Sequence, residues 1–285
     1  MLNKYERAAE MFGISGFFVS NKSNKKALPK KEVVMPVAFG KTDRGLVRPV
    51  NEDGYVINER LGLYLVVDGM GGHVNGVIAT QMIVNLFQSQ LELFIHRLPT
   101  NGDITDSDYA EYLDHVIVQV NSALYEKNKS RGDTSGQGMG AVVAGLWWIE
   151  PGRRALVFHV GDSRLYRYRQ QELTQLTVDH SVYQLWLMRG GEGEPPSRSA
   201  VFRAIGPHPE VVADIQLVDF DPQDKLLLCS DGLSNMLSDE ELAIMVANAN
   251  STQTLEALPG ELIRQANTRG GHDNITALVV GLNAG

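Results

Sequence analysis

The chain has 285 residues, 43% hydrophobic and 21% charged, a composition that excludes collagen, coiled coil and intrinsic disorder. Its 34 acidic and 26 basic residues give a net charge of −8, which argues against nucleic acid as the main partner. The single cysteine excludes a disulfide framework and a multi-cysteine zinc site, and it predicts a cytoplasmic protein.

The first 32 residues differ from the rest of the chain in charge. They carry seven Lys/Arg and three Asp/Glu, whereas the remainder carries 19 basic and 31 acidic residues. The apolar run at 11–19 precedes its basic cluster, the reverse of a secretory signal, and no run approaches the ~18–20 apolar residues of a membrane span. We therefore expect residues 1–35 to be a basic, partly ordered extension without a transmembrane segment. The alternative is a segment that docks on a membrane surface or a partner.

Hydrophobic periodicity then predicts a buried strand at 61–67, which ends at Asp68-Gly69. Asn75 can cap the long helix that follows, and a second helix around 109–124 has acidic residues at its N-terminus. Further strand patterns lie at 141–149, 154–160, 164–168, 172–176, 211–217, 225–229 and 275–281, and further helical patterns at 178–188, 239–249 and 260–268. Glycine and proline at 190–196 predict a mobile surface loop.

The order of these elements indicates the fold class. Consecutive strands joined by tight turns pair antiparallel, whereas a doubly wound sheet would place a helix after nearly every strand. The paired helices must then cover sheet faces. The pattern therefore predicts an α+β protein in which helices flank one or two antiparallel sheets.

Aspartates stand where apolar strands begin or end. They are Asp68, Asp162, Asp231 and Asp273. A single Asp-Gly is most simply a turn, but four such positions indicate a carboxylate cluster that the fold assembles. Clustered like charges need a cation, and oxygen ligands without a Cys/His set favour Mg²⁺ or Mn²⁺. Two such ions ~3.5–4 Å apart suit displacement at phosphorus.

Other polar side chains near these aspartates have two interpretations each. Arg44 and Arg48 precede the acidic segment 51–53, where they either bind phosphate or form an exposed basic loop. His73 and His272 adjoin the acidic motifs, and they either transfer protons or simply form hydrogen bonds.

Cys229 does not indicate a thiolate phosphatase. The C-x5-R pattern of that class needs an arginine six positions after the cysteine, where this chain has Asn235. The setting of Cys229 in Leu-Leu-Leu-Cys-Ser predicts a small core residue instead.

Five motifs in order resemble those of a known family. They are Thr42-Asp-Arg-Gly-Leu-Val-Arg48-Pro-Val-Asn-Glu52-Asp53, Val67-Asp68-Gly-Met-Gly-Gly-His73, Gly161-Asp162-Ser-Arg164, Cys229-Ser-Asp231-Gly232 and Asp273-Asn274. Over residues 36–283 the chain resembles the bacterial branch of the PPM-type (type 2C) metal-dependent Ser/Thr protein phosphatases. The resemblance implies one domain at 36–285, a four-layer α/β/β/α sandwich with two central antiparallel sheets. It also implies a flap at about 179–204 that influences substrate choice.

The resemblance further implies roles for individual residues. Asp68 would bridge two core ions, Gly69 would bind one of them through its carbonyl, and Asp231 and Asp273 would complete the second. Asp162, together with Asp231, matches the ligands of a weaker third ion. Arg48 would hold the phosphate and act in catalysis with Asp68 and Asp231. The supporting residues implied around the ions are Glu52 and Asp53, which would act through metal-bound waters, and Asn274 and His73.

Two positions depart from patterns within the family. Animal relatives have a histidine, proposed as general acid, at the position of Met70. Bacterial members have methionine there, as this chain does. His73 or a metal-bound water then remains to protonate the leaving group. Val77 stands where bacterial members usually have glutamate, so a contact next to the metal site is expected to be missing.

The sequence thus predicts a Mg²⁺- or Mn²⁺-dependent hydrolase that removes phosphate from Ser/Thr of bacterial phosphoproteins. A metal-bridging water is expected to attack phosphorus in line, without a covalent enzyme intermediate. By resemblance, the partner is a eukaryotic-like Ser/Thr kinase whose effect the enzyme reverses in signalling. We also expect the protein to be a monomer. The alternative is a catalytically silent module of the same fold that sequesters phosphoproteins.

Overall fold

The computed structural model describes residues 36–282 except 73, 98–103, 134 and 137. The expected extension at 1–35 lies outside the described residues, so its division from the rest of the chain stays a prediction. The strands are β1 (Val37–Asp43), β2 (Asp53–Asn58), β3 (Leu63–Met70), β4 (Gly140–Glu150), β5 (Arg154–Val160), β6 (Arg164–Arg169), β7 (Glu172–Gln175), β8 (Asp214–Asp219), β9 (Lys225–Cys229) and β10 (Ile275–Gly281). The helices are α2 (Val74–Arg97), α3 (Asp106–Ser130), α4 (Val182–Met188), α5 (Asp231–Ser234), α6 (Asp239–Ala247) and α7 (Thr252–Thr268).

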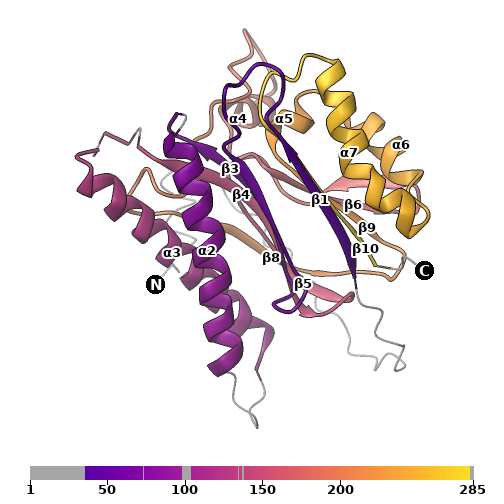
Figure 1. The fold of residues 1–285 in the computed structure, drawn as a ribbon, viewed down its shortest axis with the longest axis horizontal. Helices are drawn as coiled ribbons and strands as arrows, with labels where there is room; N and C mark the ends of the chain where they lie inside the picture. The colour runs from indigo at the N-terminus through magenta and orange to yellow at the C-terminus, as the bar shows by residue number, and fades with distance from the viewer. Residues whose placement is uncertain (1–35, 73, 98–103, 134, 137, 283–285) are drawn as a thin grey trace. The chain divides into compact units, whose positions relative to one another are not determined.

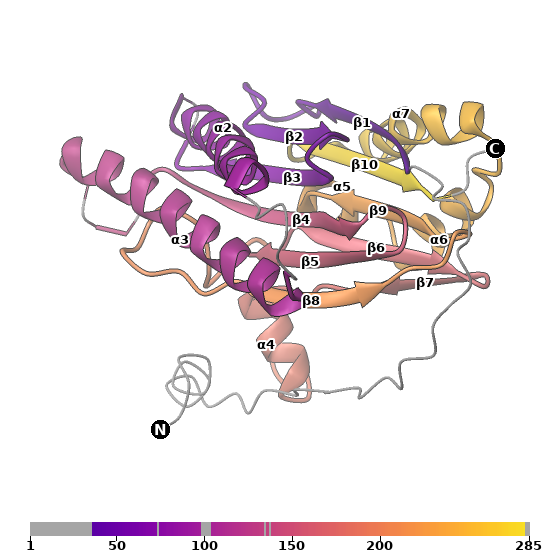
Figure 2. The same ribbon diagram turned by 90° about the horizontal axis from the view of Figure 1, so that it is seen from below.

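The strands form two five-stranded sheets. One has the order β1-β10-β9-β6-β7 and the other β2-β3-β4-β5-β8. Every pairing within them is antiparallel. Helices α2 and α3 lie on one side of the strands and α6 and α7 on the other (Figures 1 and 2). The predicted α+β sandwich with two antiparallel sheets is therefore confirmed.

Alternation along the strands distributes their side chains between three buried clusters. In β3, Leu65 and Val67 pack with residues of α2 and α3, whereas Val66 packs between the two sheets. In β9, Leu227 packs with residues of α6 and α7, whereas Leu228 faces the other sheet. Both faces of these strands are buried, which explains why they appear in the sequence as continuous apolar runs.

The strand hairpins turn at the end of the sheets away from the predicted site. The β6–β7 hairpin turns at Gln170 and Gln171, whose φ angles of 50° and 68° lie in the left-handed region that two-residue hairpin turns use. Longer connections lie at the opposite end, at 44–52, 176–213 and 269–274. The aspartates of the sequence motifs therefore lie among the long connections, where loop residues can surround them.

Most elements agree with the sequence prediction, and β5, β9 and β10 coincide with it residue for residue. The prediction omitted β1, β2 and the one-turn helix α5. Most positions of β1 and β2 are only partly buried, and these strands lack the apolar run that marked the others. Among the described helices, none is long and apolar enough to cross a membrane.

Helix boundaries differ from the prediction, among them the starts of α2, α4 and α7. Helix α2 begins at Val74, so Asn75 lies in its first turn and does not cap it. Helix α4 begins at Val182, four residues later than predicted, because Ser181 caps it by accepting from a backbone N–H of the first turn. Helix α7 begins eight residues before the predicted start, because Pro259 lies inside it and obscured the pattern.

Candidate active site

The alternation that packs the sheets also brings polar side chains to one end of the space between them. Asp68 lies two residues after Val66 on the inward face of β3, and Asp53 is its partner in register on β2. Thr276 lies on the inward face of β10, opposite Thr42 of β1. At this end of the interface, the side chains between the two sheets are polar. At the centre of the interface they are apolar.

Asp53 is held by hydroxyl groups from the facing sheet. Ser230 Oγ and Thr276 Oγ1 donate to its Oδ2 at 2.8 and 2.7 Å. The other oxygen, Oδ1, is buried and has no hydrogen-bond partner among the described residues. A buried polar atom without a partner is destabilising, so a cation or a water held by a cation would fit beside this oxygen.

Asp231 and Asp273 come from two loops that the fold brings together. Asp231 begins α5 directly after β9, and Asp273 lies in the loop before β10. The start of α5 packs so closely on that loop that a Cβ at Gly232 would overlap Asn274 O. Asn235 Nδ2 donates to Asp231 Oδ2 at 3.0 Å and orients it. Glycine at 232 is therefore what allows the two aspartates to approach.

Arg48 lies beside Asp273, and its Nη2 donates to Oδ2 at 2.7 Å. The loop that carries Arg48 is fixed by Asn274, whose Nδ2 donates to the carbonyls of Arg44 and Val50 at 2.9 Å each. Arg44 donates to Arg48 O at 2.9 Å, so its guanidinium braces the loop backbone. The sequence left open whether Arg44 and Arg48 bind phosphate or form an exposed loop. In the structure, Arg48 reaches the aspartates and Arg44 stabilises the loop.

Glu52 and Gly69 meet where β2 begins and β3 ends. Gly69 N–H and Thr80 Oγ1 donate to Glu52 O at 3.2 and 2.6 Å, and Glu52 N–H donates to Asn274 Oδ1 at 2.8 Å. A Cβ at position 69 would lie 2.5 Å from the carbonyl oxygens of Glu52 and Gly76. The glycine thus keeps two backbone segments in close contact beside Asp68.

Asp162 is buried in the turn between β5 and β6. Gly161 before it has a left-handed φ of 104°, and a Cβ there would overlap a valine of β4. Two residues after Asp162, Arg164 binds both carboxylate oxygens of Asp179, with Nε 2.9 Å from Oδ1 and Nη2 2.7 Å from Oδ2. Asp162 and Asp231 line one cleft together with residues of the 179–204 segment, which the resemblance predicts to be a flap.

Burial and mutual repulsion raise the pKa of the clustered carboxyls. The pKa of Asp68 lies well above its usual value, because of burial first and the charges of the neighbouring aspartates second. Burial likewise raises the pKa of Asp53 to about 7, of Asp231 to about 6 and of Asp162 to about 8, and neighbouring carboxylates add to each shift. Carboxyl groups in this state bind protons or metal ions to reduce their repulsion.

This set of donors fits hard divalent metal ions. The predicted ligands are carboxylate and carbonyl oxygens, the class that Mg²⁺ and Mn²⁺ take. In the part of the chain that the structure describes, ligand atoms of three side chains lie within 4.8 Å of one another at His159, His180 and Asp214, and not among these aspartates. An ion held by these aspartates would therefore need water molecules to complete its coordination shell.

Three residues singled out in the sequence lie elsewhere or take other roles. His73 lies outside the described residues, so its predicted role stays a prediction. His272 is exposed next to Asp273. Cys229 is fully buried, and burial raises the pKa of its thiol to about 12, which confirms that it is a core residue.

The residues that hold the aspartates in place were not predicted from the sequence. Ser230 stands inside a motif that was recognised, yet its bond to Asp53 depends on the packing of one sheet on the other. Thr276 lies on the inward face of its strand, which strand alternation could have indicated. The pairing of Arg164 with Asp179 joins a strand to the flap and required the fold.

Comparison with known proteins gives matches over most of the chain. The family model described as Protein phosphatase 2C matches residues 50–265. The serine/threonine phosphatase stp of Listeria monocytogenes serotype 4b (strain F2365) is 34% identical over 249 residues, which cover 84% of this chain and 93% of that protein.

Two solved structures are similar in both fold and sequence. PppA, a key regulatory component of the T6SS in Pseudomonas aeruginosa, gives a TM-score of 0.72 at 31% identity over 87% of this chain and 98% of PppA. The catalytic domain of the serine/threonine protein phosphatase PstP, in complex with two manganese ions, gives a TM-score of 0.71 at 30% identity, and the match covers 87% of this chain and 98% of PstP's.

Proposed function

The chain belongs to the protein phosphatase 2C family and is a metal-dependent serine/threonine protein phosphatase, and on this premise we propose how its residues carry out the hydrolysis. The observation that carries the proposal is the group of buried and partly buried aspartates whose pKa values are raised, next to Arg48. It combines an excess of negative charge, which suits divalent cations, with a guanidinium, which suits a phosphoryl group.

In this proposal, the core ligands are Asp68, the Gly69 carbonyl, Asp231 and Asp273. Asp162 and Asp231 hold a weaker third ion. Mg²⁺ or Mn²⁺ bound there supplies positive charge to the phosphoryl oxygens and lowers the pKa of a water molecule to near neutrality. The unpartnered Oδ1 of the buried Asp53 supports the assignment of a water-orienting role to that residue, with Glu52 beside it.

Arg48 binds the phosphate of the substrate. An arginine carries five N–H donors in a planar fork, and the bond to Asp273 uses one of them. That bond keeps the side chain at the site before the substrate arrives, while 48% of the side chain remains exposed to solvent. A phosphoryl group that enters from solvent can therefore meet a guanidinium that is already oriented.

Water attacks phosphorus directly, in line with the leaving Ser/Thr oxygen, and no residue of the enzyme becomes phosphorylated. The buried thiol of Cys229, with a pKa raised to about 12, is not available as a thiolate nucleophile. Asn235, at the place where a thiolate phosphatase has arginine, instead donates to Asp231. The leaving oxygen takes its proton from His73 or from water.

The substrates in this proposal are bacterial phosphoproteins, and a Ser/Thr kinase adds the phosphate that the enzyme removes in signalling. The bacterial serine/threonine phosphatase to which the chain is similar supports phosphoproteins as the substrates. We also assign the protein to the cytoplasm, which its single, buried cysteine supports, and we propose that it is a monomer.

The test measures turnover of p-nitrophenyl phosphate and of a phosphothreonine peptide with Mn²⁺, with and without EDTA. We expect Mn²⁺-dependent turnover that EDTA abolishes and that Asp231→Asn lowers by about 100-fold or more. Asp221→Asn, a change at an exposed aspartate paired with Arg169, is the matched control and should keep wild-type turnover. Turnover that ignores both EDTA and Asp231→Asn would contradict the metal mechanism.

The alternative, a silent module that binds phosphoproteins, predicts a different result in the same experiment. Neither substrate would be hydrolysed, but the phosphopeptide would still bind to the Mn²⁺-loaded protein. Calorimetric titration with the peptide separates the two cases, because a module gives a binding isotherm without release of phosphate.

A further inference from the structure

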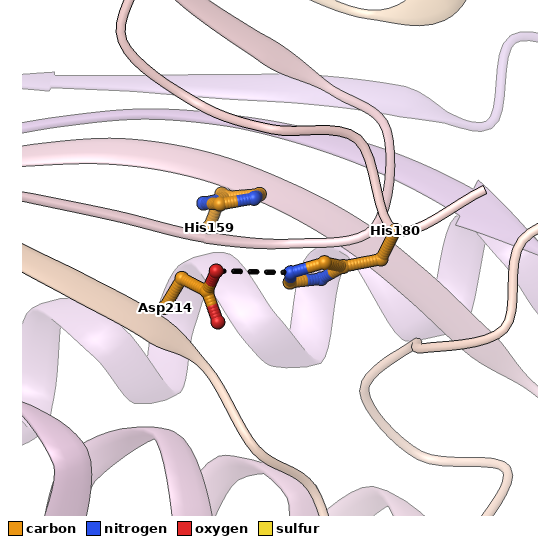
Figure 3. A group of neighbouring side chains, drawn as sticks. All are labelled: His159, His180 and Asp214. Carbon is orange, nitrogen blue, oxygen red and sulfur yellow. Dashed lines mark ion pairs between the residues drawn. The ribbon is translucent and has the colours of Figure 1, made fainter. Parts of the chain in front are cut away.

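A second polar cluster lies beside the flap, residues 179–204, and has no role in the chemistry proposed above. It consists of His159 at the end of β5, His180 at the start of the flap and Asp214 at the start of β8 (Figure 3). Asp214 and His159 are partners in register, so their side chains share one face of the sheet. Both histidines are buried, whereas the Asp214 side chain is 54% exposed.

The imidazole of His180 is held on three sides. Gly161 N–H donates to its Nδ1 at 3.1 Å, so the neutral ring carries its proton on Nε2, which lies 3.4 Å from Asp214 Oδ2. The ring of His159 stacks against it with the centroids 4.4 Å apart. His159 is itself fixed, because its Nε2 donates to Val178 O at 2.8 Å. His180 therefore has one orientation, set by Gly161 and Asp214.

Asp214 also holds the other end of the flap. Arg203 Nη1 donates to Asp214 Oδ1 at 2.9 Å. It also lies 3.0 Å from His180 Nε2, but both nitrogens carry hydrogen, so this contact is not a hydrogen bond and the carboxylate of Asp214 holds the two donors together. By residue type, His159, His180 and Asp214 could bind a metal ion, but the guanidinium already supplies positive charge at this carboxylate. We therefore treat His180, Arg203 and Asp214 as a clasp, named the flap clasp below.

Backbone hydrogen bonds join the two ends of the flap at the same place. Val182 N–H donates to Ala200 O at 2.8 Å, and Phe202 N–H donates to His180 O at 2.9 Å. The flap clasp adds side-chain bonds from both ends to one residue of β8. A single carboxylate at the sheet edge thereby fixes both ends of a segment of about 26 residues, a length at which closing a chain is entropically costly.

The flap is also bonded to the residues on both sides of Asp162. Gly161 exchanges two hydrogen bonds with His180, since Gly161 N–H donates to the ring and Gly161 O accepts from His180 N–H at 2.9 Å. On the other side, Arg164 binds Asp179, the residue that precedes His180. A displacement of Asp179 and His180 at the start of the flap must therefore also displace the turn that carries Asp162. A displacement of that turn must likewise displace the start of the flap.

We propose that Asp214 is a positioning residue, which couples the flap to the Asp162 turn through His180 and Arg203. A divalent ion at Asp162 then orders the flap, and by thermodynamic reciprocity an ordered flap strengthens ion binding at Asp162. This inference rests on the proposed role of Asp162 as a metal ligand. Asp214 itself contacts neither the ions nor the phosphate in this proposal.

The test follows the flap without using enzymatic activity. Arg189 and Arg198 are exposed in the flap, so cleavage by trypsin after them, read by mass spectrometry, reports flap opening. Mn²⁺ should slow this cleavage in the wild-type protein. Asp214→Asn keeps the shape of the side chain but removes its charge, and it should speed cleavage about fivefold and abolish most of the protection by Mn²⁺.

Turnover and stability provide the second part of the test. In Asp214→Asn, the Mn²⁺ concentration for half-maximal phosphopeptide turnover should rise about fivefold, while the thermal midpoint should move by less than about 3 °C. Arg203→Gln removes one of the two side-chain bonds of Asp214 from the side of the flap, so it should shift cleavage and Mn²⁺ dependence in the same direction by an equal or smaller amount. The double variant should be no worse than Asp214→Asn, because the bond to Arg203 is already weakened in that variant.

Asp219→Asn is the matched control, at the opposite end of β8, where Asp219 pairs with Arg154. It should behave as wild type. Equal cleavage and equal Mn²⁺ protection in wild type and Asp214→Asn would overturn the proposal, as would an equal effect of Asp219→Asn or an absence of Mn²⁺ protection in wild type. Because cleavage needs no substrate, a wild-type protein without turnover would contradict the proposed function and leave the flap clasp intact.

Discussion

Arg48 and Asp273 are joined by a contact that matters for chemistry more than for folding. The contact measures 2.7 Å, but the two side chains are 48% and 33% exposed. Exposed ion pairs contribute about 1 kcal/mol or less to stability. A guanidinium that binds a phosphoryl group forms stronger, charge-assisted hydrogen bonds. Removal of Arg48 should therefore impair substrate binding and leave the fold largely unchanged.

For Arg48→Ala, we expect kcat/KM for a phosphopeptide to fall by about 10- to 100-fold, which corresponds to the loss of charge-assisted hydrogen bonds. The thermal midpoint should move by less than about 3 °C. Arg60→Ala, which removes an exposed pair with Glu92 of α2, is the matched control and should keep wild-type kinetics. A wild-type kcat/KM in Arg48→Ala would exclude Arg48 from phosphate binding.

Single residues also show which parts of the site the sequence could predict. Asp68 and Asp231 were found because each adjoins an apolar strand and a glycine, a local pattern. Ser230 and Thr276 were not, because serine and threonine are common at strand ends and only the packing of the two sheets shows that they bind Asp53. Residues that act through long-range contacts leave no local pattern.

Among the elements, prediction succeeded where burial was complete. Strands β9 and β10 are apolar on both faces, so their ends in the sequence coincide with their ends in the fold. Strands β1 and β2 are only partly buried, and their mixture of polar and apolar residues resembles a loop. Helix α7 was shortened in the prediction because Pro259 is normally read as the end of a helix. The order and pairing of the strands required the structure.

Helix α5 offers a test at this scale, because its contact with the loop before β10 depends on Gly232. In Gly232→Ala the added Cβ would overlap the carbonyl oxygen of Asn274, a backbone atom that cannot turn aside. We expect a loss of about 1–3 kcal/mol in the free energy of unfolding and, because Asp231 and Asp273 would be pushed apart, a large loss of Mn²⁺-dependent turnover. Urea denaturation and steady-state kinetics measure the two effects.

Gly260→Ala is the matched control for that substitution. Gly260 lies inside α7, where an added Cβ would meet only the end of the Lys41 side chain at 3.6 Å. Alanine is the better helix former, so this variant should be neutral or more stable by about 0.5–1 kcal/mol. A Gly232→Ala protein as stable and active as Gly260→Ala would refute the close packing of α5.

For the molecule as a whole, the aspartate cluster governs how stability depends on pH. Burial, with repulsion between carboxylates, raises the pKa of Asp53, Asp231 and Asp162 to about 7, 6 and 8, above about 3.9 in an unfolded chain. Between about pH 4 and 8 the folded protein therefore holds more protons than the unfolded chain, and its stability falls as pH rises. Burial lowers the pKa of His159 to about 4. Between about pH 4 and 6.5 the unfolded chain therefore binds more protons at this residue, and its contribution to stability rises with pH.

The metal-free protein should consequently be more stable at pH 6 than at pH 8, with a thermal midpoint higher by several degrees. Saturating Mg²⁺ should raise the midpoint more at pH 8, because fewer protons must leave the carboxylates before the ion binds. Scanning calorimetry in EDTA and in Mg²⁺ across this range measures both effects. Asp53→Asn should make the thermal midpoint in EDTA depend less steeply on pH. A midpoint that rises from pH 6 to pH 8 in EDTA would contradict the raised pKa values.

The tight hairpins at the end of the sheets away from the aspartates determine which length changes the protein can survive. One residue inserted in β3 before Asp68 would turn that side chain from the space between the sheets toward α2, because successive strand residues face opposite ways. An insertion at Gln170 and Gln171 would leave every inward-facing position unchanged. Insertions and deletions are therefore expected in the hairpins at one end of the sheets and in the long 176–213 connection at the other. The strands between them should keep a fixed length.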